Sequence, residues 1–527
     1  MYKKITSLFL LILPMLTFAQ EKGLDKKIDE VFGNLTGWFV EIIFYQINFG
    51  GGIKIFWVLF PLILGAIYFT VYFNFINFKG MITSINIVRG KYDDIDDNSS
   101  IQDLSVAGDV TPGGDAVETI KVENHEGEVS HFQALTAALS ATVGLGNIAG
   151  VAIAVSIGGA GATFWMIIAG FLGMSSKFVE CTLGVKYRDI EPDGTVYGGP
   201  MYYLSKGLKN KGLGRVLAIV FAIFVVGGSF GGGNMFQVNQ AFKLVEYISG
   251  GKESFLFEKG WLFGLVMAIF VGIVIIGGIK KIAKVTDKIV PFMVAIYVSA
   301  SLFVIFSNVG MIGDAFSQII DGAFNAKGIA GGVIGVLVQG FKRAAFSNEA
   351  GVGSASIAHA AVKTKYPASE GMVALLGPFI DTVIVCTMTA LVLIITGNVT
   401  ADNSGLNSAQ AILLTSSAFE SVISWFPYML TVAVVLFAFS TMVSWSYYGF
   451  QGWSYLFGRS KKTEYIYKII FCLFVIVGAA SSLDSVIDFS DAMIFAMLVP
   501  NMIGLILLAP KVKEELNRYI KAIGLKN

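Results

Sequence analysis

The stretch SATVGLGNIAGVA, residues 140–152, places paired glycines inside a long apolar run. A second stretch, FSNEAGVGSASIAHA at residues 346–360, repeats the pattern about 200 residues later, with G-x-G followed by a small polar residue. Paired glycines weaken a helix and permit backbone angles that leave N–H and C=O groups without helical partners. In hydrocarbon, such groups are tolerated only where they line a cavity or bind a ligand. Each stretch therefore predicts a broken helix at a binding site.

The whole chain is apolar enough for a membrane protein. Hydrophobic residues make up 55% of the 527 residues, charged residues only 14%, and the mean hydropathy is +0.70. Soluble proteins are about a quarter charged, and a membrane crossing takes about 20 apolar residues. We expect an all-α polytopic membrane protein with about eleven transmembrane helices. The first is expected at 53–78, and the others at 132–157, 162–185, 216–245, 261–277, 289–307, 329–361, 371–396, 425–455, 466–480 and 489–508.

The charges of the loops predict which side of the membrane each faces. Lys and Arg concentrate in alternate connections, including 186–215 and 280–288, and in the tail, whereas 397–424 has none. Short cytoplasmic loops concentrate basic residues, so the C-terminus is expected in the cytoplasm. We expect a multi-pass protein of the bacterial inner membrane.

The two glycine stretches also predict an internal repeat. Five predicted spans separate their starts, an odd number, so the stretches cross the membrane in opposite directions. This is the pattern of two inverted five-helix repeats. We assign them to 132–327 and 328–510, after the extra N-terminal helix at 53–78.

The remaining segments are expected outside the bilayer. Residues 1–19 resemble a cleaved signal peptide, with an uncleaved anchor as the alternative, and 20–52 follows outside the cytoplasm. Residues 79–131 form an acidic cytoplasmic stretch, with eleven acids and two bases between Lys91 and Glu128. Residues 511–527 form a cytoplasmic tail.

Other classes of function find little support in the sequence. The chain has no Walker motif, no HExxH and no CxxC, and its net charge of +1 offers no field for nucleic acid. We therefore expect no enzyme, no organic cofactor and no obligate protein partner, and membrane lipid as the surroundings. An ion or solute channel remains the alternative, although a channel filter usually needs a symmetric ring of residues.

Several motifs resemble known transporters. VGLGN, GGAGATFW and FVECTLGVKY resemble the first core helices of LeuT-fold amino-acid transporters. The alanine or glycine:cation symporter family is closer, through GNIAGVA, GFKRAAFSNEAGVGSA, LGPFIDT and FSTMVSWSYYG, in order between residues 132 and 510. The resemblance implies that sodium, or alternatively a proton, drives uptake of alanine or glycine by alternating access.

The resemblance also implies where the coupling ion binds. Its ligands would be the backbone carbonyls of Ser140, Val143 and Phe437 and the hydroxyls of Ser440 and Thr441. Five neutral oxygens suit a hard monovalent cation. A second ion would use two further side chains, Thr142 and Asn147. The alternative for these hydroxyls and amides is hydrogen bonding between helices.

The amino-acid substrate is expected between the two breaks. The walls would be formed by residues of both breaks and by two side chains from other spans, namely Gly144, Gly146, Asn147, Asn348, Gly351, Gln237 and Trp445. The Gln237 amide suits either end of a zwitterion, and Trp445 would limit the size of the substrate side chain. Core packing is the alternative for Trp445.

Charged residues at membrane depth are functional candidates. We expect Glu180 to brace a broken helix and Arg343 to line the outer vestibule. Asp381 is the group that a proton-coupled mechanism would use. All three are assigned gating or structural roles.

The signal-like N-terminus gives a first test. Small residues flank Phe18, as a signal peptidase requires, so the mature chain is expected to begin at Gln20. Intact-mass measurement of the purified protein should show the loss of residues 1–19. A mass that retains them would mean that the segment is an anchor.

Overall fold

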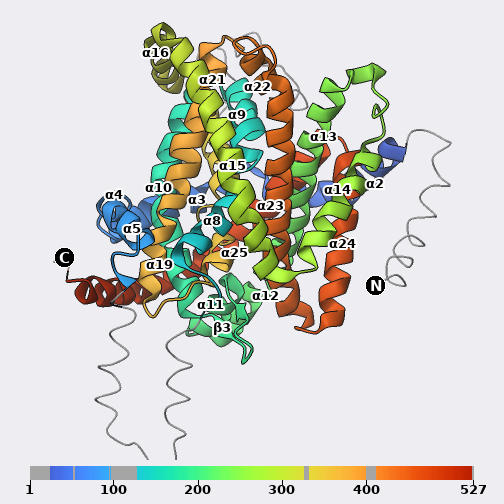
Figure 1. Cartoon of the computed structure of the whole chain (residues 1–527). Helices are drawn as coiled ribbons and strands as arrows, with labels where there is room; N and C mark the ends of the chain where they lie inside the picture. Colours follow the sequence, from blue (N-terminus) through green and yellow to red (C-terminus); the bar gives the residue numbers. More distant parts are fainter. Residues whose placement is uncertain are drawn as a thin grey trace, which may run out of the picture.

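A computed structural model describes residues 24–50, 54–93, 95, 127–325, 332–398 and 411–524. The predicted signal peptide and most of the acidic stretch lie outside the described residues. Most helices stand side by side in an upright bundle, with α16 at one end and α11 and β3 at the other (Figure 1).

The structure is mostly helical, with two short antiparallel hairpins, β1 with β2 and β3 with β4. Before the first glycine stretch, the elements are α2 (Leu24–Ile43), β1 (Gln46–Asn48), β2 (Lys54–Phe56), α3 (Leu59–Tyr72), α4 (Ile76–Lys79) and α5 (Met81–Val88). From there to the second stretch, they are α8 (His131–Thr142), η1 (Gly146–Gly150), α9 (Val151–Gly158), α10 (Gly161–Lys186), β3 (Asp189–Ile190), β4 (Val196–Tyr197), α11 (Pro200–Gly207), α12 (Lys211–Phe230), η2 (Gly231–Met235), α13 (Phe236–Ile248), η3 (Gly251–Glu253), α14 (Gly260–Ile275), α15 (Gly278–Ser307), η4 (Val309–Met311) and α16 (Ile312–Phe324). The remaining elements are α17 (Gly332–Asn348), α18 (Ala355–His359), α19 (Pro367–Ala374), α20 (Leu376–Pro378), η5 (Phe379–Cys386), α21 (Thr387–Ile395), α22 (Ala411–Glu420), α23 (Phe426–Phe457), α24 (Lys461–Ala480) and α25 (Leu483–Ala522).

Within the described residues, seven helices are long and apolar enough to cross a membrane. The pair α8 and α9 would make an eighth span, bent by 54° at the first glycine stretch. Three shorter apolar helices, α3, α14 and α22, fall below that length. The structure thus confirms an all-helical membrane protein without fixing the predicted number of eleven spans.

Both glycine stretches break their helices. The predicted span at 132–157 is divided between α8 and α9, and the span at 329–361 between α17 and α18. Three segments are π-helices: η1 follows the first break, and η2 and η5 interrupt two further spans. Sequence periodicity does not predict a π-helix, because one extra residue in a turn leaves the apolar composition unchanged.

The N-terminal region differs most from the expected spans. The predicted span at 53–78 contains the 14-residue helix α3, which ends where Asn74 and Phe75 adopt left-handed angles (φ 52° and 59°). The expected extracytoplasmic segment at 20–52 contains the 20-residue helix α2. Few L-residues other than Asn and Asp adopt positive φ, so a turn at Phe75 is not readable from the sequence.

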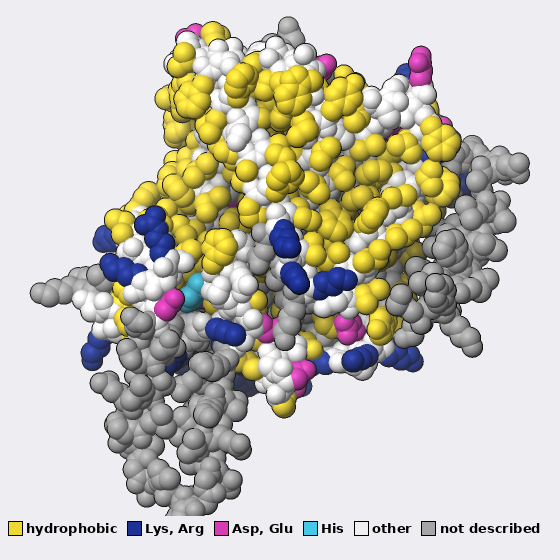
Figure 2. All heavy atoms as spheres, viewed as in Figure 1, with side chains coloured by type: hydrophobic (Ala, Val, Ile, Leu, Met, Phe, Trp, Pro, Cys, Tyr) yellow, Lys and Arg dark blue, Asp and Glu magenta, His cyan; other side chains and the backbone are white. Residues whose placement is uncertain are grey.

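The exterior is apolar around the middle of the bundle. Hydrophobic side chains cover most of the visible face, and Lys and Arg gather towards the end that carries α11 and β3 (Figure 2). Exposed apolar residues of α14 and α15 include Val266, Phe270, Ile273, Phe292 and Phe303. This distribution fits helices that face lipid, and it places the basic loops at one end of the bundle.

Glycines permit close helix contact between α14 and α24. A Cβ at Gly264 would lie 2.8 Å from Ile476 Cα, and one at Gly260 would lie 2.0 Å from the Ala479 carbonyl oxygen. Small residues four apart allow membrane helices to approach this closely. The contact leaves no room for a larger side chain on this face of α14.

Gly264→Val should therefore separate α14 from α24 and destabilise the protein by about 1–3 kcal/mol, the usual cost of overpacking. The measurement is the thermal unfolding midpoint of purified protein in detergent. Gly313→Ala in α16 is the matched control, because a Cβ there meets nothing within 4 Å. Equal midpoints for both variants would show that the close contact does not contribute to stability.

Candidate functional site

The first break exposes the C-terminal carbonyls of α8. That helix ends at Thr142, so the carbonyls of its last turn receive no hydrogen bonds from the N–H groups of a following helical turn. Side chains replace part of the lost pairing: Gly144 N donates to Asn147 Oδ1 (2.9 Å), and Leu145 N donates to Gln237 Oε1 (3.2 Å). Gln237 lies on α13, directly after the π-helix η2. The amide oxygens of Asn147 and Gln237 thus pair backbone N–H groups that the break leaves without helical partners inside the bundle.

The second break, residues 349–354, is more extended. Glu349, Gly351 and Gly353 all have positive φ (56°, 79° and 99°). The Asn348 side chain accepts from Ala350 N (2.9 Å). Two of these three positions require glycine, which is the reason that the G-x-G pattern marks the break.

Asp381 joins the two breaks. Asn147 Nδ2 donates to Asp381 Oδ2 (2.8 Å) and to Ser347 Oγ (3.1 Å), and Ser347 Oγ donates to Asp381 Oδ1 (2.7 Å). Thr382 Oγ1 also donates to Asp381 Oδ1 (2.8 Å) and accepts from Asn348 Nδ2 (2.8 Å). The sequence singled out Asp381 as a gating or structural residue and as the group that a proton-coupled mechanism would use. The structure places it in the centre of the site, fully buried.

The proposed ion ligands lie where α8 meets α23. Thr441 Oγ1 donates to the Ser140 carbonyl (3.1 Å), and Ser444 Oγ donates to Ser140 Oγ (2.9 Å). Ser440 Oγ donates to the carbonyl of Phe437 (3.2 Å). The described hydrogen bonds include none to the carbonyl of Val143, the residue that caps the end of α8.

These oxygens fit a monovalent cation. The hydroxyls of Ser440 and Thr441 each donate one hydrogen bond and keep their lone pairs, and the Ser140 carbonyl, which accepts from Thr441, keeps a second one. The Phe437 carbonyl lies inside α23 and accepts from Ser440 as well as within its helix, so Ser440 would have to turn away from it before it could hold an ion. Among the described residues, no group of three His, Cys, Asp or Glu side chains could hold a metal ion. A cation near α8 and α23 would therefore depend on neutral oxygens.

Thr142 lies in the last turn of α8, and its hydroxyl donates to the carbonyl of Ala138 (3.2 Å), one turn back on its own helix. Ser440 donates in the same way to the carbonyl of Phe437, so this bond alone does not distinguish the two hydroxyls as ion ligands. Asn147, the proposed partner of Thr142 in a second ion site, donates its amide N–H groups to the Asp381 cluster. Its amide oxygen accepts from Gly144 N (2.9 Å).

Trp445 and the glycines define how much room the site has. Trp445 Nε1 donates to Glu349 Oε1 (3.1 Å), and its indole packs against Gly233 of η2, where a Cβ would lie 2.2 Å away. A Cβ at Gly144 would lie 2.6 Å from Thr441 Oγ1, whereas one at Gly146 has 3.5 Å to its nearest neighbour. Trp445 is 2% exposed, so it is both a core residue and a neighbour of the second break.

Glu180 contacts the second break through Asn501, a residue that the sequence did not single out. Asn501 Nδ2 donates to the carbonyl of Gly351 (2.8 Å) and to Glu180 Oε2 (3.3 Å). Tyr203 OH donates to Asn501 Oδ1. This contact agrees with a bracing role for Glu180.

Arg343 is not an open vestibule residue in this structure. It is 3% exposed and forms an ion pair with Asp491 of α25, which also pairs with Lys342 (Nζ to Oδ2, 3.0 Å). Lys342 in turn lies over the ring of Phe44, 4.4 Å from its centroid. The pairing with a residue 148 positions away could not be read from the sequence.

Ser347, Ser444 and Asn501 are the site residues that sequence reasoning missed. Ser347 and Ser444 stand within the quoted motifs, beside residues that were chosen. Asn501 is a single amide in the apolar run of α25, which is the signal that would have found it.

Residues 113–526 match the sequence pattern of the sodium:alanine symporter family. The sodium/alanine symporter AgcS of Methanococcus maripaludis is 43% identical over 398 residues, covering 75% of this chain and 85% of that protein. The probable sodium/glutamine symporter GlnT of Bacillus subtilis is 34% identical over 396 residues, covering 75% and 79%.

A solved structure shares the fold. MhsT, crystallised with L-phenylalanine, superposes with a TM-score of 0.55 over 73% of this chain and 89% of its own, at 17% identity. This likeness confirms the LeuT fold that the motifs predicted. From the extent of the family match and the identity to AgcS, the chain belongs to the sodium:alanine symporter family.

Proposed function

We propose that this protein is a sodium-coupled symporter that carries small neutral amino acids, alanine or glycine, into the cell by alternating access. The observation that carries this proposal is the meeting of two broken helices at Asn147, Ser347 and Asp381, beside the oxygens of Ser140 and Thr441. Family membership and the relative named a sodium/alanine symporter support sodium as the coupling ion.

The shared use of α8 explains how ion and substrate would be coupled. The ion would bind to the carbonyls at the end of α8, and the substrate would bind at residues 144–147, the next four residues of the chain. The hydroxyls of Ser440 and Thr441 would complete the ion site from α23. An ion that orders the end of α8 also orders the substrate site, so binding of one favours binding of the other.

The substrate site favours a small side chain. Relatives are named for alanine and for glutamine, so the family spans more than one size of substrate. In this chain, Trp445 is fixed by Gly233 and Glu349 beside the second break. We propose that Gly144, Gly146, Gln237, Asn348 and Gly351 line the remaining space, with Gln237 facing the zwitterion.

Asp381 gives a reason to test proton coupling as the alternative. It is a buried carboxylate that contacts Asn147 of the first break and Ser347 beside the second, and a carboxylate can carry a proton across a membrane. In this structure both of its oxygens accept hydrogen bonds from Asn147, Ser347 and Thr382. These three donors fix the carboxylate at the junction of the two breaks, and the family match and the relative named a sodium/alanine symporter favour sodium as the moving ion.

Purified protein in liposomes should accumulate radiolabelled alanine when a sodium gradient is imposed. Accumulation should not occur with a proton gradient in sodium-free buffer. Counterflow of labelled against unlabelled alanine separates a carrier from a channel, because only a carrier exchanges its substrates. Proton-driven uptake without sodium would contradict the proposal and would assign the coupling to Asp381.

Removing both hydroxyls should weaken the link between ion and substrate. Ser440→Ala with Thr441→Ala deletes two of five proposed ligands at little change in volume. We expect sodium to lose about 1–3 kcal/mol of coupling to substrate binding, that is, about 5- to 150-fold in affinity. The measurement is the sodium half-saturation of alanine binding.

Thr431→Ala is the matched control for this double variant. Thr431 lies on the same helix and donates to the carbonyl of Pro427 (2.8 Å), away from the breaks. Its removal should leave the sodium half-saturation unchanged. A double variant that folds and keeps the wild-type sodium dependence would refute the ion-site assignment.

A further inference from the structure

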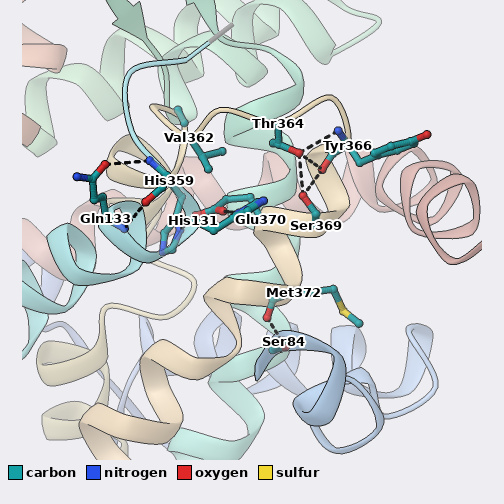
Figure 3. A network of polar contacts seen from close by, with 12 residues as sticks. Ser84, His131, Gln133, His359, Val362, Thr364, Tyr366, Ser369, Glu370 and Met372 are labelled. Atoms are coloured by element: carbon teal, nitrogen blue, oxygen red, sulfur yellow. Dashed lines mark hydrogen bonds and ion pairs between the residues drawn. The ribbon is translucent and has the colours of Figure 1, made fainter. Parts of the chain in front are cut away.

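A buried carboxylate between two histidines lies at the basic end of the bundle. Glu370 of α19 is fully buried, and its two oxygens contact different imidazoles: Oε2 meets His131 Nδ1 and Oε1 meets His359 Nδ1 (Figure 3). His131 is the first residue of α8, and His359 is the last residue of α18. One carboxylate thus contacts both α8, the first half of one broken helix, and α18, the second half of the other.

Backbone hydrogen bonds close the same region. Lys363 N donates to the carbonyl of Val129 (2.8 Å), and Glu128 N donates to the carbonyl of Ala361 (2.7 Å). These bonds join the chain just before α8 to the chain just after α18. The N-terminus of α8 is fixed further by the capping box of Ser130 and Gln133. α8 cannot move away from α18 and α19 without breaking these backbone hydrogen bonds and the contact between His131 and Glu370.

One of the two histidines is within reach of the cytoplasmic solution. The His131 side chain is 12% exposed and lines a pocket of about 380 Å³ together with Gln133 and Lys363. His359 is 2% exposed and is covered. A proton from this side therefore reaches His131 first.

The surrounding charges do not change near neutral pH. The other titratable groups around the cluster are Cys181 on α10, Asp93, Glu128 and Lys363 along the pocket that His131 lines, and Arg188 in the adjoining loop; α5 has none. The ordinary pKa values of these side-chain types lie outside the interval from about 6 to 8, whereas histidine lies near 6.5. Histidine is therefore the side-chain type in the cluster whose charge changes in this interval.

We propose that Glu370, held by His131 and His359, is a positioning residue that keeps the cytoplasmic path closed, and that protonation of His131 from the cytoplasm strengthens this closure. The inference rests on the proposed function for the direction of transport. When His131 is charged, it forms an ion pair with Glu370; when it is neutral, its N–H donates an ordinary hydrogen bond. Charge-assisted bonds are about twice as strong as neutral ones. An acid cytoplasm would thus slow the step in which the site opens inward.

Cys386 provides a native probe of this opening. Its Sγ lies 3.4 Å from Asn147 Nδ2 and 3.3 Å from Ser347 Oγ, at the junction of the two breaks. A membrane-impermeant methanethiosulfonate reagent is added to inverted membrane vesicles, whose outer face is the cytoplasmic one. Modification of Cys386 is followed by peptide mass spectrometry at pH 6 and pH 8. Each rate is divided by the rate for unfolded protein at the same pH, which removes the intrinsic reactivity of the thiol.

The expected result is a normalised rate that is about fivefold lower at pH 6 than at pH 8, the size expected when a charge-assisted bond replaces a neutral one. His131→Gln, which cannot become charged, should react quickly at both pH values. His131→Arg, which is always charged, should react slowly at both. His359→Gln is the second variant, and it should also raise the rate at pH 6.

His125→Gln is the matched control, because His125 is the remaining histidine of the chain and lies outside the described residues. It should keep the wild-type pH profile. A wild-type rate that does not change with pH, or a His131→Gln variant that keeps the wild-type profile, would overturn the proposal. Loss of the profile in His125→Gln would overturn it as well.

Alanine uptake is measured separately on the same preparations. Absence of sodium-driven uptake by the wild-type protein would count against the proposed function alone. The Cys386 rates would still decide the closure proposal, because they require no substrate.

Discussion

The demand of a peptide backbone for hydrogen bonds in hydrocarbon governs this structure. A helix can be broken inside a membrane only when other groups take over the pairing of its N–H and C=O groups. Here Gln237 and Asn147 accept from the N–H groups of the first break, and Asn348 and Asn501 serve the second. The carbonyls that remain at the end of α8 are the oxygens that we propose as cation ligands. The proposed binding site therefore follows from the way in which the hydrogen-bonding groups of the broken helices are paired.

The sequence predicted those parts of the fold that depend on local composition. Paired glycines marked both breaks, for two different reasons. In the second break, Gly351 and Gly353 adopt positive φ, which only glycine does at no cost. In the first break, Gly144 leaves the space that Thr441 Oγ1 needs, since a Cβ would lie 2.6 Å from it. Apolar length located most spans to within a few residues. The joining of Asn147 to Asp381 is different, since it links positions 234 apart and depends on how three helices pack. For the same reason, Ser444 and Asn501 were missed and Arg343 was assigned to a vestibule although it is buried.

The N-terminal region has its own role in the packing. The family description begins at residue 113, so α2 and the β1–β2 hairpin lie before it. Asp29 accepts from the backbone N–H and the hydroxyl of Ser482, the residue that caps α25, and Phe32 packs edge-on against Phe489 of that helix (5.1 Å). Phe44 covers Lys342, which pairs with Asp491. The extra segment thus braces one end of α25 against α17.

The three π-helices change how homologous sequences should be aligned. Each adds one residue to a turn, which rotates all later residues by roughly 100° about the helix axis. The π-helix η2 lies between α12, which packs on α25, and the first turn of α13, which carries Gln237. A homologue that lacks the extra residue would present a different side chain at the place of Gln237, even where the flanking sequences agree. A one-residue gap at residues 231–235 would therefore remove the acceptor of Leu145 N–H from the first break as effectively as a substitution at position 237 itself.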